Sequence, residues 1–214
     1  MKKKLFYFSI IGCSLPLLMG ILYFSRLPQL LPSHWNAAGE IDGYMDKSFV
    51  LFGLPILLLF AHLFVIWSMN HDPKHKNIPA IMYYLIYFTI PAISILVTFM
   101  SINCAIENGI SFDVSFVLMV FVGLLLLVIG NYLPKCKQSY TVGIKTPWAL
   151  DDEENWNKTH RIGGFLWSIG GIMTILSAFL PADLRIVVLF VTIMICVMIP
   201  YLYSYFIYQK KMKD

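Results

Sequence analysis

The polar segment LPSHWNAAGEIDGYMDK, Leu31–Lys47, concentrates side chains that could bind a metal ion or carry out acid–base chemistry. It contains one histidine and three carboxylates: His34, Glu40, Asp42 and Asp46. Zinc sites draw mainly on histidine and cysteine, whereas this segment offers only hard carboxylates beside its histidine. We therefore interpret it as a structured loop, with a zinc site as the alternative. Gly39 and Gly43 permit turns, Asp42 is expected to bind backbone amides, and Lys47 to pair with an acid at the head of the next helix.

A second polar set, Glu153, Asn157 and His160, has the spacing of one helical face and follows the acidic run DDEE. Two metal-competent side chains make a poor metal site, and no nucleophile stands nearby in the sequence. The acidic run instead predicts a helix start, with Asp151 as the N-cap and Glu154 as its capping-box partner. We expect this helix to continue directly into the apolar segment that follows. The set is interpreted as caps and a partner surface rather than a catalytic face.

Within the apolar segments, the ionisable candidate is His62. A proton relay at His62 is one interpretation, and a hydrogen bond to a neighbouring helix is the other. Intramembrane protease chemistry would need a Ser/His pair, two aspartates or an HExxH helix, and these segments contain none of them. The four cysteines form no CxxC pair, so we expect neither a disulfide framework nor a cysteine zinc site. We expect no cofactor and no enzymatic activity.

Membrane helices must position these side chains, because 58% of the 214 residues are hydrophobic and 13% are charged. A run of about 20 apolar residues is long enough to cross a bilayer as a helix. Six such runs occur: Leu5–Phe24, Phe49–Met69, Ile81–Ile102, Val114–Leu133, Ile162–Leu180 and Ile186–Tyr208. We predict an all-α fold of six transmembrane helices in one domain, residues 1–214, with the last two helices in a tight hairpin. Gly164, Ser168 and Gly171 form a small-residue strip suited to close helix packing.

The distribution of basic residues predicts the orientation of these spans. Of the 16 Lys and Arg residues, only Arg26, Lys47 and Arg185 fall on one side. Because cytoplasmic loops are enriched in Lys and Arg, both termini are expected to be cytoplasmic. The start MKKK and the segment Ile10–Cys13 resemble a secretory signal and a lipidation site. Too few apolar residues precede Cys13, however, so we expect an uncleaved first helix.

Two long polar connections remain, residues 25–48 outside and residues 134–161 inside, and loops of this length usually carry function. Pro147 biases Thr146 toward an extended conformation, and Trp148 is expected to anchor the inner loop at the membrane interface. The outer residues that we predict to bind a partner are His34, Trp35, Asn36, Gly39, Asp42, Tyr44 and Lys47. The inner ones are Asn131, Pro134, Lys135, Gly143, Lys145, Thr146, Pro147, Trp148, Trp156, Thr159, His160 and Arg161.

The inner segment IGNYLPKCKQSYTVGIKTPWALDDEENWNKTHRIGG resembles the signature of the SdpI family of bacterial membrane immunity proteins. The matching positions are Gly130, Asn131, Leu133, Pro134, Lys135, Gly143, Ile144, Thr146, Pro147, Trp148, Trp156, Lys158, Thr159, His160, Arg161 and Gly163. The outer loop resembles an N-terminal hairpin domain, of no known function, that is often joined to this family. The resemblance implies a hairpin region over residues 1–70 and an SdpI-like region over residues 114–208. Lys145 stands where arginine is common, and lysine would grip a carboxylate or phosphate less specifically.

This resemblance implies a bacterial plasma-membrane protein that protects a producer cell from its own secreted, membrane-active toxin peptide. It also implies a signalling receptor that holds a small cytoplasmic DNA-binding repressor at the membrane. The expected partners are therefore a toxin peptide on the outer loop, a repressor on the inner loop and the lipid bilayer. Direct nucleic-acid binding is not expected. The alternatives are a small transporter or lipid-handling protein, which the uncharged spans disfavour, and a membrane enzyme, for which the loops suggest no known chemistry.

Overall fold

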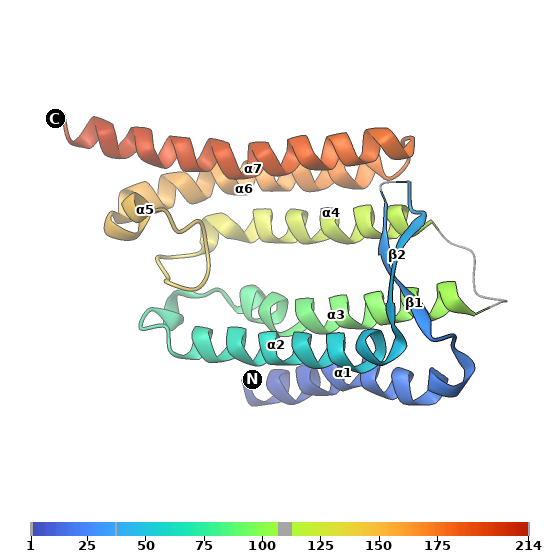
Figure 1. The fold of residues 1–214 in the computed structure, drawn as a ribbon. Coiled ribbons are helices and arrows are strands. Elements are labelled where there is room, and N and C mark those ends of the chain that lie inside the picture. The colour runs from blue at the N-terminus through green and yellow to red at the C-terminus, as the bar shows by residue number, and fades with distance from the viewer. Residues whose placement is uncertain (1, 37, 107–112, 214) are drawn as a thin grey trace. The chain divides into compact units, whose positions relative to one another are not determined.

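The computed structural model describes residues 2–36, 38–106 and 113–213 (Figure 1). Predictions that concern Met1, Ala37, residues 107–112 or Asp214, including both ends of the predicted domain, lie outside the described residues. The long helices are α1 (Lys2–Tyr23), α2 (Leu54–Asn70), α3 (Ala80–Ala105), α4 (Val114–Tyr132), α6 (Glu153–Ser177) and α7 (Ala182–Lys211). The short helical elements are η1 (Phe24–Arg26), η2 (Phe49–Gly53), η3 (His75–Asn77), η4 (Leu133–Lys135) and α5 (Pro147–Asp151).

Five of the described helical segments are long and apolar enough to cross a membrane: Lys3–Arg26, Phe49–Asn70, Ala80–Ala105, Val114–Lys135 and Ala182–Lys211. They overlap five of the six predicted spans, so the prediction of a helical, multi-pass membrane protein is confirmed. The remaining predicted span, Ile162–Leu180, lies largely within α6. The sequence EENWNKTHR fills the N-terminal turns of α6 and leaves a shorter apolar stretch. The count of six therefore stays a prediction, whereas the continuation of the polar helix into this segment is confirmed.

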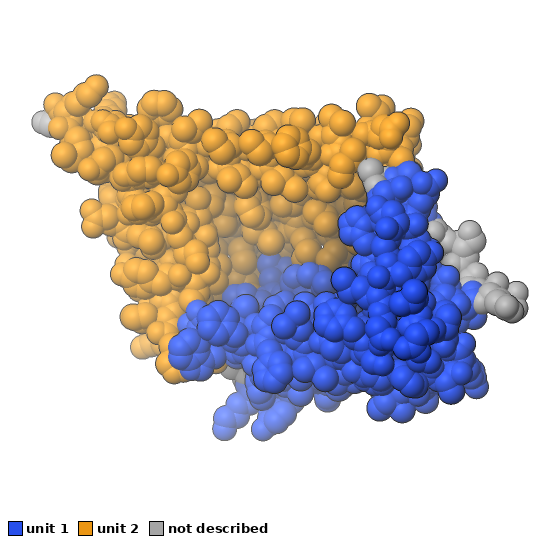
Figure 2. Space-filling model, viewed as in Figure 1, with its two compact units in different colours: residues 1–68, 83–114 blue, residues 69–82, 115–214 orange. Residues whose placement is uncertain are grey.

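The chain forms two compact units, residues 1–68 with 83–114 and residues 69–82 with 115–214 (Figure 2). The first unit contains α1, most of α2 and α3, and a small antiparallel sheet of β1 (Leu30–Trp35) and β2 (Ile41–Asp46). This hairpin is built from the predicted outer loop, for which the sequence had suggested turns but no strands. A buried cluster lies at the base of the hairpin, formed by Leu27, Leu31, Val50, Leu51 and Ile102.

Close contact between α4 and α6 characterises the second unit. A Cβ atom built on Gly171 would lie 2.5 Å from the backbone nitrogen of Leu127, and one on Gly130 would lie 2.5 Å from that of Ser168. A Cβ atom on Gly164 would lie 2.5 Å from Pro134 Cδ. Glycine lets two backbones approach this closely, as small residues do at interfaces between membrane helices. The predicted role of the small-residue strip on α6 is thus confirmed.

The predicted hairpin of the last two helices is also confirmed, because α6 and α7 run side by side (Figure 1). Pro200 lies inside α7 and has no backbone N–H, so the carbonyl of Cys196 lacks its usual partner within the helix. The indole Nε1–H of Trp167 donates to this carbonyl at 2.9 Å. Since an unsatisfied carbonyl is costly inside a bilayer, α6 stabilises the proline-containing turn of α7.

Candidate functional site

The β1–β2 hairpin brings together two of the residues predicted in the outer loop, His34 and Asp42. His34 Nδ1 lies 2.5 Å from Asp42 Oδ1, and both side chains are largely exposed. Tyr44 is also exposed and lies two residues from Asp42 in β2. A Cβ atom on Gly43 would lie 2.9 Å from His34 Cβ, so glycine at this position allows the two strands to pair closely. The prediction that Gly43 permits a turn is therefore wrong, because Gly43 lies within β2. The result is an exposed polar and aromatic patch.

Asn36 organises the turn of this hairpin. Its side-chain oxygen accepts hydrogen bonds from the backbone amides of Ala38 at 2.9 Å and Glu40 at 3.0 Å. Its amide nitrogen donates to the carboxylate of Glu40 at 3.0 Å. The predicted capture of backbone amides by Asp42 is therefore wrong, since Asn36 fills that role while Asp42 pairs with His34. The turn predicted at Gly39 is confirmed by its φ of +82°.

Lys47 fixes the base of the hairpin. Its ammonium group donates to the carbonyls of Phe24 at 3.3 Å and Leu27 at 3.4 Å, and it lies 4.4 Å from the centre of the Phe24 ring. The predicted pairing of Lys47 with an acid is wrong, because the carbonyls of Phe24 in η1 and of Leu27 just after η1 accept its hydrogen bonds instead. Trp35 is half-buried at the end of β1. Of the predicted outer residues, His34, Asp42 and Tyr44 are therefore those that present an accessible surface.

The centre of the inner loop is a buried stack of two rings. Trp156 and His160 lie 3.9 Å apart at an interplanar angle of 21°, and both are fully buried. The Trp156 Nε1–H donates to the Cys136 carbonyl at 2.7 Å. Gly143, with a φ of +123°, lies directly against both rings, where a Cβ atom would overlap His160 Nε2. Helix α6 thus supports the loop through an aromatic pair.

The tautomer of His160 follows from its two neighbours. Its Nδ1–H donates to the carbonyl of Trp156 at 2.8 Å, and its Nε2 accepts from the backbone N–H of Ile144 at 2.9 Å. Burial lowers the pKa of His160 to about 4, although the bond to Trp156 opposes this shift. The neutral ring therefore has no free lone pair for a metal or a proton. Glu153 and Asn157 are exposed on α6 whereas His160 is buried, so these three side chains do not converge on a catalytic or metal-binding face.

A second buried network joins α5, α6 and α7. Thr146 caps α5 by accepting from the Ala149 amide at 3.1 Å, and its hydroxyl lies 2.6 Å from that of Ser204. Ser204 donates to Asn155 Oδ1 at 2.8 Å, and Thr159 donates to the same oxygen at 3.0 Å. The amide nitrogen of Asn155 returns a bond to the Ser204 carbonyl at 2.9 Å. Each of these polar side chains is thus paired, as buried polar groups require.

Sequence reasoning missed Asn155 and Ser204. The one feature of the sequence that could have indicated Asn155 is its position four residues before Thr159, which places both on one side of a helix. The extended backbone predicted for Thr146 before Pro147 is confirmed by its ψ of 150°.

Asp72 is a further residue that sequence reasoning missed. It lies between α2 and α3 and is 4% exposed. Its Oδ2 accepts from the hydroxyls of Ser139 at 2.6 Å and Thr141 at 2.8 Å, and from the amides of Tyr140 at 3.0 Å and Thr141 at 3.1 Å. Burial alone would raise the pKa of Asp72, but these hydrogen bonds lower it. The carboxylate therefore holds the first turn of the inner loop in place.

The cap of α6 differs from the prediction. Asp151 ends α5, and Asp152 is the N-cap of α6, accepting from the Glu154 amide at 3.0 Å. The predicted cap at Asp151 is wrong because the chain becomes extended only at Asp152, with φ −129° and ψ 117°. Lys211 of α7 pairs with Asp152 at 2.8 Å and with Glu154 at 2.6 Å. Hydrogen bonds from Lys158 and then Lys211 lower the pKa of Glu154 to about 2.

The remaining inner residues divide by exposure. Trp148 packs against Tyr201, Tyr205 and Tyr208 of α7, with ring centres 5.4, 5.1 and 6.1 Å apart. Its placement at a membrane interface stays a prediction. The exposed predicted residues are Asn131, Pro134, Lys135, Lys145, Pro147 and Arg161. The inner candidates thus comprise a buried scaffold and an exposed rim, half of whose residues are basic.

Comparison with known proteins places both loops within matched regions. A model of the SdpI/YfhL protein family matches residues 135–204, and a domain of unknown function, DUF1648, matches residues 11–59. Immunity protein SdpI of Bacillus subtilis (strain 168) is 24% identical over 212 residues, which cover 98% of each chain. The search of solved structures finds no match. The Trp156–His160 stack lies within the first matched region and the hairpin within the second, so the chain is similar to the SdpI family at both loops and to its relative along nearly its whole length.

Proposed function

We propose that this protein is a membrane immunity protein that protects its cell from a secreted, membrane-active toxin peptide without catalysing a reaction. The main support for this proposal is the similarity to immunity protein SdpI along 98% of both chains. The inner site supports a non-enzymatic role, because both ring nitrogens of His160 are engaged by backbone groups. Its buried side chains are arranged to hold a loop in shape.

The proposed topology has six spans, with both termini in the cytoplasm and the β1–β2 hairpin outside. Its support is the concentration of Lys and Arg on one side, which follows the rule for cytoplasmic loops. In this topology residues 1–70 present the outer motif loop 25–48, and residues 114–208 present the inner motif loop 134–161. Cysteine-accessibility labelling tests it: reporters at exposed Asn157 and Tyr44 should react from opposite sides of the membrane.

The outer patch of His34, Asp42 and Tyr44 is the proposed toxin contact. Its support is exposure: the hydrogen-bonded side chains of His34 and Asp42 and the ring of Tyr44 are exposed on a hairpin that Asn36 and Lys47 hold in shape. A rigid loop has little conformational entropy to lose when it binds a peptide, which favours recognition.

A protection assay tests this contact. The protein is expressed in a toxin-sensitive bacterium, and survival is measured for wild type, His34→Ala and Tyr44→Ala. Each substitution should raise toxin sensitivity by about tenfold, the effect of losing one interface hot spot. Asn157→Ala, an exposed change outside the hairpin, is the matched control and should protect normally. Wild-type protection by both hairpin variants at normal protein levels would rule out this patch; no protection by the wild type would rule out the function.

A signalling role is the second part of the proposal. The exposed cations Lys135 and Lys145 border the buried scaffold, and they would suit an acidic surface on a cytoplasmic repressor. Affinity capture from membranes, with and without toxin, tests it by asking whether a DNA-binding protein is retained only when toxin is present. A Lys135→Glu/Lys145→Glu variant should lose that protein and keep toxin protection.

A small transporter is the second candidate, and His62 is the observation that favours it. This side chain is fully buried in α2, and its Nε2 lies 2.9 Å from the Ser9 hydroxyl of α1. Within the described residues its Nδ1 has no hydrogen-bond partner. Proton flux into vesicles containing the protein tests this role. A flux that His62→Ala abolishes would favour transport over immunity.

A further inference from the structure

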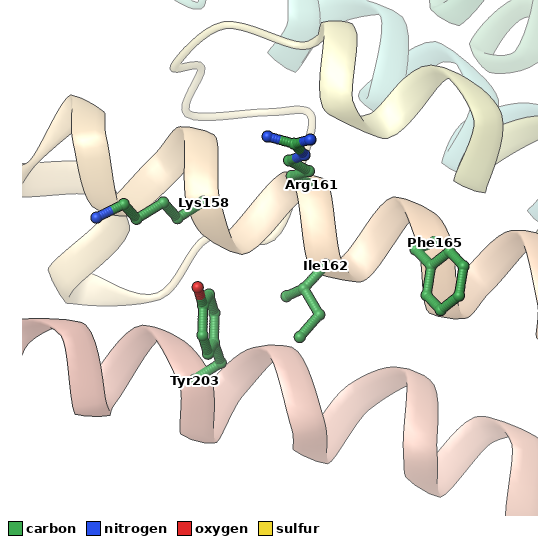
Figure 3. A pocket seen from close by; sticks show the side chains of 5 residues that line it. All are labelled: Lys158, Arg161, Ile162, Phe165 and Tyr203. Carbon is green, nitrogen blue, oxygen red and sulfur yellow. The ribbon is translucent and has the colours of Figure 1, made fainter.

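A groove between α6 and α7 combines two cations with an apolar wall. Its volume is about 510 Å³, and it is lined by Lys158, Arg161, Ile162, Phe165 and Tyr203. In Figure 3, Tyr203 rises from α7 toward α6 on the side of Lys158, and Phe165 marks the other end. The two cations precede Ile162, where α6 changes from polar to apolar sequence. In the proposed six-span topology, on which this inference rests, the groove lies where α6 passes from the cytoplasm into the membrane.

The groove lining itself holds two cations and no acid, whereas Asp151 and Glu153 lie nearer the start of α6 and do not line it. Lys158 pairs with Glu154 at 2.6 Å, but Glu154 is also held by Lys211 at 2.6 Å, and Lys211 further pairs with Asp152. Asp152 and Glu154 are thus matched by two lysines. Arg161 adds a further positive charge, and no acid in the described part of the chain forms an ion pair with it. An anion at this end would meet an uncompensated guanidinium.

The other end of the groove is suited to a hydrocarbon chain. The Phe165 side chain is 63% exposed, and Ile162 lies one turn from Lys158 on the same side of α6. Tyr203, 37% exposed, contributes an apolar ring with a polar hydroxyl between the two ends. Aromatic residues of this kind are favoured where headgroups meet acyl chains.

We propose that this groove binds one anionic phospholipid, with the phosphate against Lys158 and Arg161 and an acyl chain along Ile162 and Phe165. The planar guanidinium of Arg161 can donate two parallel hydrogen bonds to phosphate oxygens. A soluble anion would use the cations but would leave the apolar wall in water. This lipid site is independent of the proposed immunity function, because it depends only on α6, α7 and the proposed topology.

Lipid retention by the purified full-length protein tests the proposal. The protein is incubated in detergent with equal amounts of phosphatidylglycerol and phosphatidylcholine, and bound lipid is counted by native mass spectrometry. Wild type should retain phosphatidylglycerol preferentially. Lys158→Gln/Arg161→Gln should lower this retention by about tenfold or more, since each basic residue contributes severalfold to the attraction of anionic lipid. The control Lys210→Gln/Lys213→Gln removes the same charge elsewhere in the second unit and should behave like wild type.

Two further arms separate a lipid from a free anion. Phe165→Ser keeps both cations and alters an exposed side chain, so the fold should persist, which a thermal melt checks. Under the proposal it should lower phosphatidylglycerol retention, and millimolar inorganic phosphate should not displace the lipid from wild type. Normal retention by Phe165→Ser, displacement by phosphate, or equal losses in the two double variants would each overturn the proposal.

Discussion

Replacing Gly143 with alanine tests whether the stacked rings of the inner loop shape its backbone. Gly143 has a φ of +123°, a conformation that residues with a side chain rarely adopt. Its Cα faces His160 Nε2 and the Trp156 ring, so an added methyl group would lie 2.8 Å from two Trp156 carbons. The same Nε2 accepts the Ile144 amide at 2.9 Å. Alanine therefore strains the backbone and also pushes against the stack.

The two effects can be estimated separately. Backbone strain at such a position costs about 1–3 kcal/mol, and an extra methyl in a packed interior costs typically about 1–3 kcal/mol. The expected loss in the free energy of unfolding is therefore about 2–6 kcal/mol. Gly39→Ala is the matched control, because Gly39 also has a positive φ, +82°, but lies in a partly exposed hairpin turn. Gly39→Ala should lower the free energy of unfolding only by the cost of the backbone strain, about 1–2 kcal/mol.

Thermal unfolding in detergent, followed by near-ultraviolet circular dichroism, measures both variants. The tryptophan signal should decrease in Gly143→Ala even below the transition, because displacing the loop alters the environment of Trp156. Equal stability of Gly143→Ala and Gly39→Ala would refute the reasoning, since it would mean that the stack does not confine the loop.

Three other outcomes are expected. Because burial lowers the pKa of His160 from 6.5 to about 4, stability should be fully present above pH 6.5 and fall by about 3 kcal/mol as the pH drops toward 4. His160→Gln should flatten this dependence, and an unchanged pH profile would contradict a buried neutral ring. Asp72→Asn should lower the unfolding free energy by about 1–3 kcal/mol, because one carboxylate oxygen accepts several of the loop's donors; chemical denaturation measures it, with exposed Asp151→Asn as the control. Trp167→Phe should cost about 1 kcal/mol by leaving the Cys196 carbonyl without its donor. In the Pro200→Ala background, where a backbone N–H is restored, that cost should largely vanish, and an equal cost in both backgrounds would refute the compensation.

The sequence alone determined the membrane class, the apolar helices and the course of α6. These depend on local properties, namely apolar length, a proline after Thr146 and small residues at helical spacing, which act within a few turns of the chain. The resemblance to the SdpI family could be recognised in the same way, because the motifs that carry it are contiguous in the sequence.

Only the tertiary structure decided which polar side chains are buried and which are presented. Asp72 binds Ser139 from 67 positions away, and Asn155 binds Ser204 from 49 positions away. Neither pairing can be recognised from the neighbouring residues in the sequence, because each pairing depends on which faces of the helices pack together. The same holds for Asn155 and Asn157, which differ in sequence by two positions but lie on buried and exposed faces of α6. A helix turns about 100° per residue, so packing against α7 determines which asparagine joins the scaffold.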